Sequence, residues 1–171
     1  MSNSLKWTEN TDLITSKARS RIWTLRRLKK LGFDHKFILE VYIKEIRSIL
    51  EYCVPLWNGS LTKKESEKIE KIQKSVLKLL LKNHYISYSE ACEQFNLEKL
   101  YIRRQKLCVQ FSNKEYKKPD NGIFEKFQPK SKRLAHTKVV LEPKTRTERH
   151  YKSAIPYLSR LLNKQCNKKQ K

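Results

Sequence analysis

The stretch from residue 34 to residue 55, DHKFILEVYIKEIRSILEYCVP, constrains the fold more than any other part of the chain. Its apolar residues recur every three or four positions, which is the spacing of one face of an α-helix. Asp34 is a good N-cap, Phe33 is placed to pack on Ile38, and Pro55 forbids continuation. We therefore expect one helix over residues 34–54, about 30 Å long. Its predicted inner face is centred on Ile38, Tyr42, Ile46, Ile49 and Cys53, with Leu39, Ile43 and Leu50 beside them.

So broad an apolar face needs other helices to cover it, and the rest of the chain supplies them. We expect a first helix over about residues 11–31, with Gly32 at its carboxyl end. Thr62 and Glu65 form a capping box that opens a helix reaching about residue 82. Two further helices are predicted over about residues 87–95 and 98–116. Only 3 Gly and 5 Pro are present, and this scarcity of turn residues counts against an all-β fold.

The pattern changes at residue 117, where prolines and lysines replace the apolar periodicity. We expect an extended, largely irregular basic arm over residues 117–150, with a possible short strand at 137–141. A short helix follows, with Pro156 suited to its first position and a polar tail from Asn163. The predicted fold is all-α, with a bundle of about four to five helices as one domain over residues 1–116. The arm is a second region, and residues 151–171 form a short helix and basic tail.

The charge balance points to an anionic partner. The chain has 39 basic and 17 acidic residues, a net charge of +22, and residues 114–171 hold 17 of the basic and 5 of the acidic residues. An excess of this size is usually relieved by a polyanion, of which nucleic acid is the first candidate and an acidic membrane surface the second.

Two basic clusters fall on predicted helices. One is on the first helix, and the other is a lysine row at helical spacing on the Thr62 helix, comprising Lys64, Lys68, Lys71, Lys78 and Lys82. Two interpretations of these clusters remain open at this point. Each is either a solvated, solubilising helix face or a surface that follows phosphates.

Several classes of chemistry find no support in the sequence. The four cysteines show no C-x-x-C spacing and no cluster with histidine, so we expect buried, reduced thiols in an intracellular protein, nuclear or cytoplasmic, and no zinc site. The three aspartates are isolated, and there is no glycine-rich phosphate loop. We therefore expect no enzyme activity, no cofactor and no metal. No apolar run is long enough to span a membrane, and MSNSLKW lacks the core of a signal peptide.

Several stretches, taken in order, resemble the reverse transcriptases of non-LTR retrotransposons, the LINE-type or jockey-like elements. They are SKARSRIWTLRRLKKLGF (16–33), ILEVYIKEIRSILEYCVPLW (38–57), IEKIQKSVLKLLL (69–81), LEKLYIRRQKL (97–107) and RTERHYKSAIPYLSRLLN (146–163). LEYCVPLW and SKARSR are the most specific of them. The resembling region lies downstream of the polymerase palm and includes the thumb, and it covers roughly residues 5–163. The aromatic-x-Asp-Asp active site of that family has no counterpart in this chain.

The resemblance implies a detached carboxyl-terminal fragment whose thumb-like helices grip RNA or an RNA–DNA duplex by its backbone. Two alternatives stay open: an unselected remnant with no biochemical role, or a thumb acting in trans with a separate palm. In the remnant, Leu13, Trp23 and Leu56 would be exposed. Carried over to this chain, the resemblance and the charge together give the candidate nucleic-acid-binding residues Arg19, Arg21, Arg26, Arg27, Lys64, Lys68, Lys71, Arg103 and Arg104.

Overall fold

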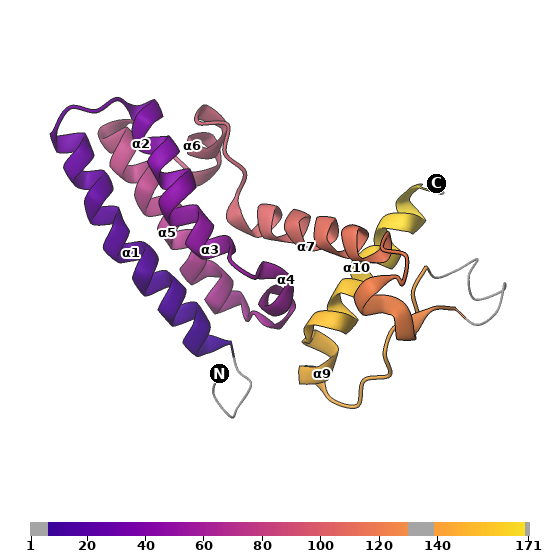
Figure 1. The fold of residues 1–171 in the computed structure, drawn as a ribbon. Coiled ribbons are helices and arrows are strands. Elements are labelled where there is room, and N and C mark those ends of the chain that lie inside the picture. Colours follow the sequence, from indigo (N-terminus) through magenta and orange to yellow (C-terminus); the bar gives the residue numbers. More distant parts are fainter. Residues whose placement is uncertain (1–6, 130–138, 170–171) are drawn as a thin grey trace. The chain divides into compact units, whose positions relative to one another are not determined.

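The computed structural model describes residues 7–129 and 139–169, with side chains to residue 165 in the second range (Figure 1). All regular secondary structure in these residues is helical, which confirms the predicted all-α class. The chain divides into two compact units: unit 1 is Met1–Tyr52 with Leu61–Arg103, and unit 2 is Cys53–Ser60 with Arg104–Lys171. The units cut across the predicted boundary at residue 116, because helix α7 (Leu100–Tyr116) begins in unit 1 and continues in unit 2.

Unit 1 is built on three long helical rods. They are α1 (Thr8–Lys30), the continuous run of α2 (His35–Val41), η1 (Tyr42–Arg47) and α3 (Ser48–Glu51), and α5 (Lys63–Leu81). The short 3₁₀ turn η3 (Lys82–His84) and helix α6 (Tyr88–Gln94) follow α5. Most of the predicted inner residues of the first and third rods are buried: Ile14, Ala18, Ile22, Leu25, Ile69, Ile72, Val76 and Leu80. Leu28, also predicted on the inner face of the first rod, is only half-buried.

The central rod is not a uniform α-helix. Its middle segment η1 is a π-helix, and the buried residues follow one another at every fourth position: Ile38, Tyr42, Ile46 and Leu50. In an α-helix a four-residue spacing drifts by about 40° around the axis at each step. The wider π turn, with its i→i+5 bonds, removes part of that drift. The rod therefore keeps one narrow face on the core along its whole length.

This corrects the predicted inner face of the central rod. Ile49 is only half-buried and Cys53 is exposed, while Leu50 takes the core position. The prediction assumed 3.6 residues per turn throughout, and the π segment moves the later residues by about one position. The rod also ends sooner than residue 54: Tyr52 is extended, and Cys53 adopts a left-handed conformation with φ of 52° before Pro55.

The predicted junction between α1 and the central rod is confirmed, although α1 begins at Thr8 and not at about residue 11. Gly32, with φ of +87°, closes α1, and the N–H groups of Gly32 and Phe33 donate to the carbonyls of Lys29 and Leu28, both at 3.2 Å. Asp34 caps α2 by accepting the Phe37 N–H at 2.9 Å. The ring of Phe33 stacks on that of Phe37 with centroids 5.0 Å apart.

A buried polar network joins the central rod to α5 and α6. The Tyr42 hydroxyl donates to the Gln73 amide oxygen at 2.7 Å, and the Gln73 amide nitrogen donates to the Tyr88 hydroxyl at 3.1 Å. The Tyr88 hydroxyl in turn donates to Glu70. Burial raises the pKa of both tyrosines, so both stay neutral donors. Each member of the network has a partner, as a buried polar group requires.

Unit 2 has its own small core. It contains α4 (Val54–Trp57), η2 (Asn58–Ser60), most of α7, η4 (Gly122–Phe127), α9 (Glu148–Lys152) and α10 (Ala154–Lys169). Trp57 and Phe124 are its largest buried apolar side chains. Burial raises the pKa of the Cys108 thiol to about 12, although the Asn58 hydrogen bond and the Arg104 charge act in the opposite direction.

The predicted arm contributes to this core in two places. Phe124 in η4 is buried, and so is Val140, beside which Leu141 donates its N–H to the Phe127 carbonyl at 2.7 Å. Residues 139–141 form no strand, and residues 137–138 of the predicted strand lie outside the described residues.

The last helix is longer than predicted. It begins at Ala154, so Pro156 occupies its third position, still in the first turn, where no N–H partner is needed. Asn163 is buried rather than part of a polar tail: its Oδ1 accepts the N–H groups of Val139 and Val140 at 3.0 and 3.1 Å, and its Nδ2 donates to the Val140 carbonyl at 2.9 Å.

The π segment gives a first prediction. Deleting the exposed Lys44 should convert η1 to an ordinary α-helix. The deletion shortens the interval from Tyr42 to Ile46 from four residues to three and leaves the intervals from Ile38 to Tyr42 and from Ile46 to Leu50 at four. All four residues should therefore stay on the core face. We expect the free energy of unfolding to change by less than about 1 kcal/mol, since the Lys44 side chain contributes an exposed ion pair with Glu40 and its carbonyl an exposed bond from Ser48.

The matched control is deletion of the exposed Ser75 from the purely α-helical α5. That deletion turns Val76 and Leu80 by about 100° away from the core and should cost several kcal/mol. Urea denaturation of both variants measures the difference. Equal losses for the two deletions would contradict the role assigned to the π turn.

A second prediction concerns Gly59 in unit 2. An added Cβ at this residue would lie 2.5 Å from Cγ of Tyr157 and 2.8 Å from the Lys152 carbonyl oxygen. Gly59→Ala should therefore destabilise the protein by about 1–3 kcal/mol. Part of this loss should disappear in a background that carries Tyr157→Ala, as measured by a double-mutant cycle in denaturant. Strict additivity of the two losses would rule out the Tyr157 clash.

Candidate nucleic-acid interface

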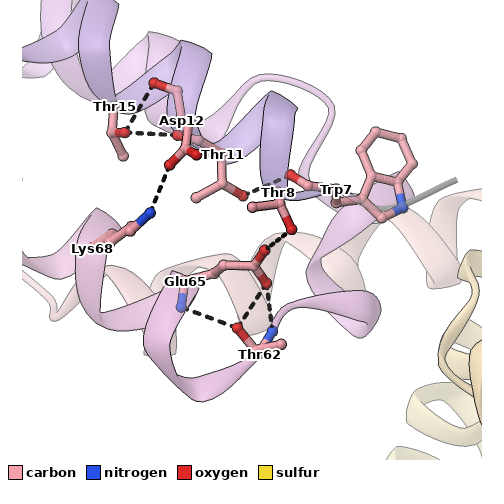
Figure 2. A network of polar contacts seen from close by, with 8 residues as sticks. All are labelled: Trp7, Thr8, Thr11, Asp12, Thr15, Thr62, Glu65 and Lys68. Carbon is pink, nitrogen blue, oxygen red and sulfur yellow. Dashed lines mark hydrogen bonds and ion pairs between the residues drawn. The ribbon is translucent and has the colours of Figure 1, made fainter. Parts of the chain in front are cut away.

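The starts of α1 and α5 are joined by a polar network that Figure 2 shows at close range. At its centre is the capping box of α5, in which Thr62 Oγ1 accepts the Glu65 N–H at 3.2 Å and Glu65 accepts the Thr62 N–H at 2.8 Å. The other Glu65 oxygen accepts the Thr8 hydroxyl at 2.7 Å, and one turn later Lys68 pairs with Asp12 at 2.7 Å. The first turns of the two helices are thus held together.

The far ends of the same two helices are joined by Lys29. Its ammonium group donates to the carbonyls of Leu79 and Leu80, the latter at 2.7 Å, and so satisfies the last turn of α5. Burial lowers the pKa of Lys29, and the nearby charge of Lys82 lowers it further. The amino-terminal ends of α1 and α5 contact each other, and so do their carboxyl-terminal ends. The two helices therefore run parallel, with their ends level.

This register brings two basic rows to adjacent flanks. Residues seven apart lie on one side of a helix, so Arg19 and Arg26 share the side of Asp12, which faces α5. On α5, Lys64 and Lys71 lie on either side of Lys68, which faces α1. We call the combined surface the α1–α5 basic face and define it as Arg19, Arg26, Arg27, Lys30, Lys64, Lys68, Lys71 and Lys78.

Six of the nine predicted site residues belong to this face. Arg19, Arg26, Arg27, Lys64 and Lys71 are exposed, and Lys68 is half-buried in its pair with Asp12. They come from two helices that are far apart in the sequence but adjacent in unit 1. The structure therefore assembles two separately predicted clusters into one surface.

The other three predicted residues lie elsewhere. Arg21 is on the opposite flank of α1, where it forms an ion pair with Glu45 of the central rod. Arg103 pairs with Glu51, which also contacts Arg47. Both arginines therefore contribute to the packing of unit 1 and do not extend the α1–α5 basic face.

Arg104, also predicted to bind nucleic acid, is only 1% exposed. Its Nε donates to the Asn58 side-chain oxygen at 3.1 Å within unit 2. A phosphate has no access to a guanidinium buried in this way, so we leave Arg104 out of the interface. The sequence spacing carried a signal for this burial, because Arg104 is four residues from both Leu100 and Cys108, which are buried, whereas Arg103 points about 100° away.

Trp23 is a feature of this surface that the candidate list did not include. It is 59% exposed, and the Arg27 guanidinium lies over its ring, 5.3 Å from the centroid. The sequence could have predicted this placement, because Trp23 follows Arg19 by four residues and precedes Arg27 by four, which puts all three on one side of a helix. Lys30, seven residues after Trp23, lies on the same side of α1.

The described residues offer no sign of metal chemistry. Within residues 7–129 and 139–165, no group of three or more His, Cys, Asp or Glu side chains is arranged to hold a metal ion. None of the described helices has the length and apolar character needed to cross a bilayer.

Comparison with protein-family models, curated proteins and solved structures finds no match to this chain.

The Glu65 network gives a third prediction. Burial raises the pKa of Glu65, but hydrogen bonds from Thr62 and Thr8 outweigh it and leave the pKa below its ordinary value of 4.5. A lowered carboxyl pKa stabilises the folded state above the ordinary pKa, and this contribution is lost as the pH falls through the folded-state pKa.

Glu65→Gln should therefore lower the free energy of unfolding at pH 7 and have a smaller effect at pH 3. Urea denaturation at both pH values measures the two differences. The exposed Glu67→Gln is the matched control and should have little effect at either pH. An effect of Glu65→Gln that is the same at both pH values would contradict the assignment.

Proposed function

We propose that this chain binds RNA or an RNA–DNA duplex non-specifically, through phosphate contacts made by the α1–α5 basic face. The observation that carries the proposal is the parallel register of α1 and α5, which joins two basic rows into one surface within unit 1. Scattered surface lysines would give solubility alone, whereas a continuous track of cations can follow a continuous row of phosphates.

The dimensions of the face suit a nucleic-acid backbone. At ~1.5 Å per residue, Arg19 to Lys30 spans about 16 Å and Lys64 to Lys78 about 21 Å. One strand of a duplex carries one charge per about 3.4 Å of helix axis, so the length of each row corresponds to the axial rise of roughly five or six nucleotides. The ion pair of Lys68 with Asp12 is no obstacle, because an exposed pair is worth about 1 kcal/mol or less and can be exchanged for a phosphate.

In this proposal the chain is a thumb-like module of a non-LTR retrotransposon polymerase without its palm. It holds a template or template–primer and performs no chemistry itself. The ordered sequence resemblance suggests this origin, and the basic face is what a thumb that grips a nucleic-acid backbone would need. An in-frame or frameshifted aspartate-pair palm encoded directly upstream would be the corresponding genomic observation.

A second candidate is a module that docks on a separately encoded palm. The exposure of Leu13, Trp23 and Leu56, at 53%, 59% and 50%, is what we expected of an unselected remnant with no biochemical role, and it suits a palm-docking module equally well. Exposed leucines of this kind are common singly, however, and carry less weight than the ordered basic face. Co-purification of the chain with an element polymerase is the measurement that separates the two functions.

The proposed function gives a fourth prediction. Replacing Arg26 and Lys71 together by Gln removes one charge from each row of the α1–α5 basic face. Each lost phosphate contact should reduce the slope of log affinity against log salt by about 0.7–0.9. We therefore expect a slope shallower by about 1.5 and weaker binding to RNA hairpins, measured by fluorescence anisotropy at several salt concentrations.

The matched control is Arg21→Gln with Lys44→Gln, which removes the same net charge away from that face. The control should keep nearly the full slope. Equal slopes for both double variants would show that net charge alone drives binding and would overturn the assigned face. Binding that is independent of salt in the unmodified chain would overturn the proposed function altogether.

A further inference from the structure

Trp23 is the larger of the two apolar side chains that α1 leaves exposed, the other being Leu13. The helix buries its apolar residues Ile14, Ala18, Ile22 and Leu25 in unit 1, whereas the indole of Trp23 is 59% exposed on the flank that carries the basic row. Trp57, in unit 2, is 1% exposed. Trp23 therefore contributes little to the core, and its large apolar rings are available to a ligand.

The surroundings of Trp23 determine which kind of ligand suits it. Arg19 and Arg27 lie one turn away on either side, Arg26 and Lys30 lie on the same flank, and the Arg27 guanidinium holds one face of the indole from 5.3 Å. An apolar protein surface that covered Trp23 would have to bury these charges, at considerable cost. A ligand that is flat, aromatic and anionic meets no such cost, and a nucleotide has all three properties.

We propose that Trp23 is a stacking platform for an unpaired base, so that the α1–α5 basic face takes single-stranded nucleic acid or a junction with an unpaired nucleotide in preference to uninterrupted duplex. This inference rests on the proposed function and specifies its ligand. The basic row holds the backbone, the base lies on the indole, and Arg27 is close enough to contact either the ring or the adjoining phosphate. A fully paired duplex presents no base face along its length, so it gains from the charges alone.

The test compares a single-stranded homopolymeric RNA with a long, fully paired RNA duplex, using the full chain and its Trp23→Ala and Trp23→Phe variants. Trp23→Ala should weaken binding to the single strand by about 5-fold to 100-fold and leave duplex affinity within about 2-fold. Trp23→Phe keeps an aromatic face and should retain most of the affinity. The single strand should also quench the tryptophan fluorescence of the unmodified chain, and this quenching should be lost in Trp23→Phe.

Leu13→Ala is the matched control, because Leu13 is an exposed apolar residue of the same helix outside the basic face. It should change neither affinity. All variants should unfold at the temperature of the unmodified chain, since both side chains are exposed. If the unmodified chain binds both RNAs and Trp23→Ala weakens both equally or neither, the stacking inference fails while the proposed function stands. If the unmodified chain binds neither RNA, the proposed function itself fails, and the inference fails with it.

Discussion

The parallel alignment of α1 and α5 is the constraint on which the proposed surface depends. It is held at the start by Glu65, which closes the α5 cap and accepts the Thr8 hydroxyl, and at the end by Lys29, which satisfies the final carbonyls of α5. Both residues serve an end of α5 as well as the packing, because Glu65 completes its cap and Lys29 donates to its last carbonyls. A shift of α1 along α5 would break the Thr8 and Lys29 contacts together.

The alignment also explains how a strongly basic chain folds without bringing its charges too close together. The inner faces of α1 and α5 are apolar, and the basic residues that flank the seam point outward, with Asp12 and Lys68 paired where the flanks come nearest. Where two cations do approach, at Lys29 and Lys82, the pKa of Lys29 is lowered by burial and by that neighbouring charge. A bound polyanion would relieve this repulsion.

Most of unit 1 could be predicted from the sequence because its signals are local. A capping box, a glycine at a helix end and apolar residues every three or four positions each act within one or two turns, so neither the neighbouring helices nor the solvent can easily override them. The π segment is the exception, since Tyr42 to Arg47 contain no residue that excludes an ordinary α-helix. Its wider turn follows from the need to keep Ile46 and Leu50 on the core, which is a demand of the packing.

The sequence by itself determined the all-α class, the carboxyl end of α1, the limits of α5, and the presence of two basic rows. Tertiary structure alone decided that these rows share a face, that Arg103 pairs with Glu51, and that Phe124, Val140 and Asn163 close a second core. The reason is physical: helix formation and capping are set by residues within a few positions of one another. Whether a charged side chain meets solvent, a carboxylate or a phosphate depends on which distant segment packs beside it, and no local spacing carries that information.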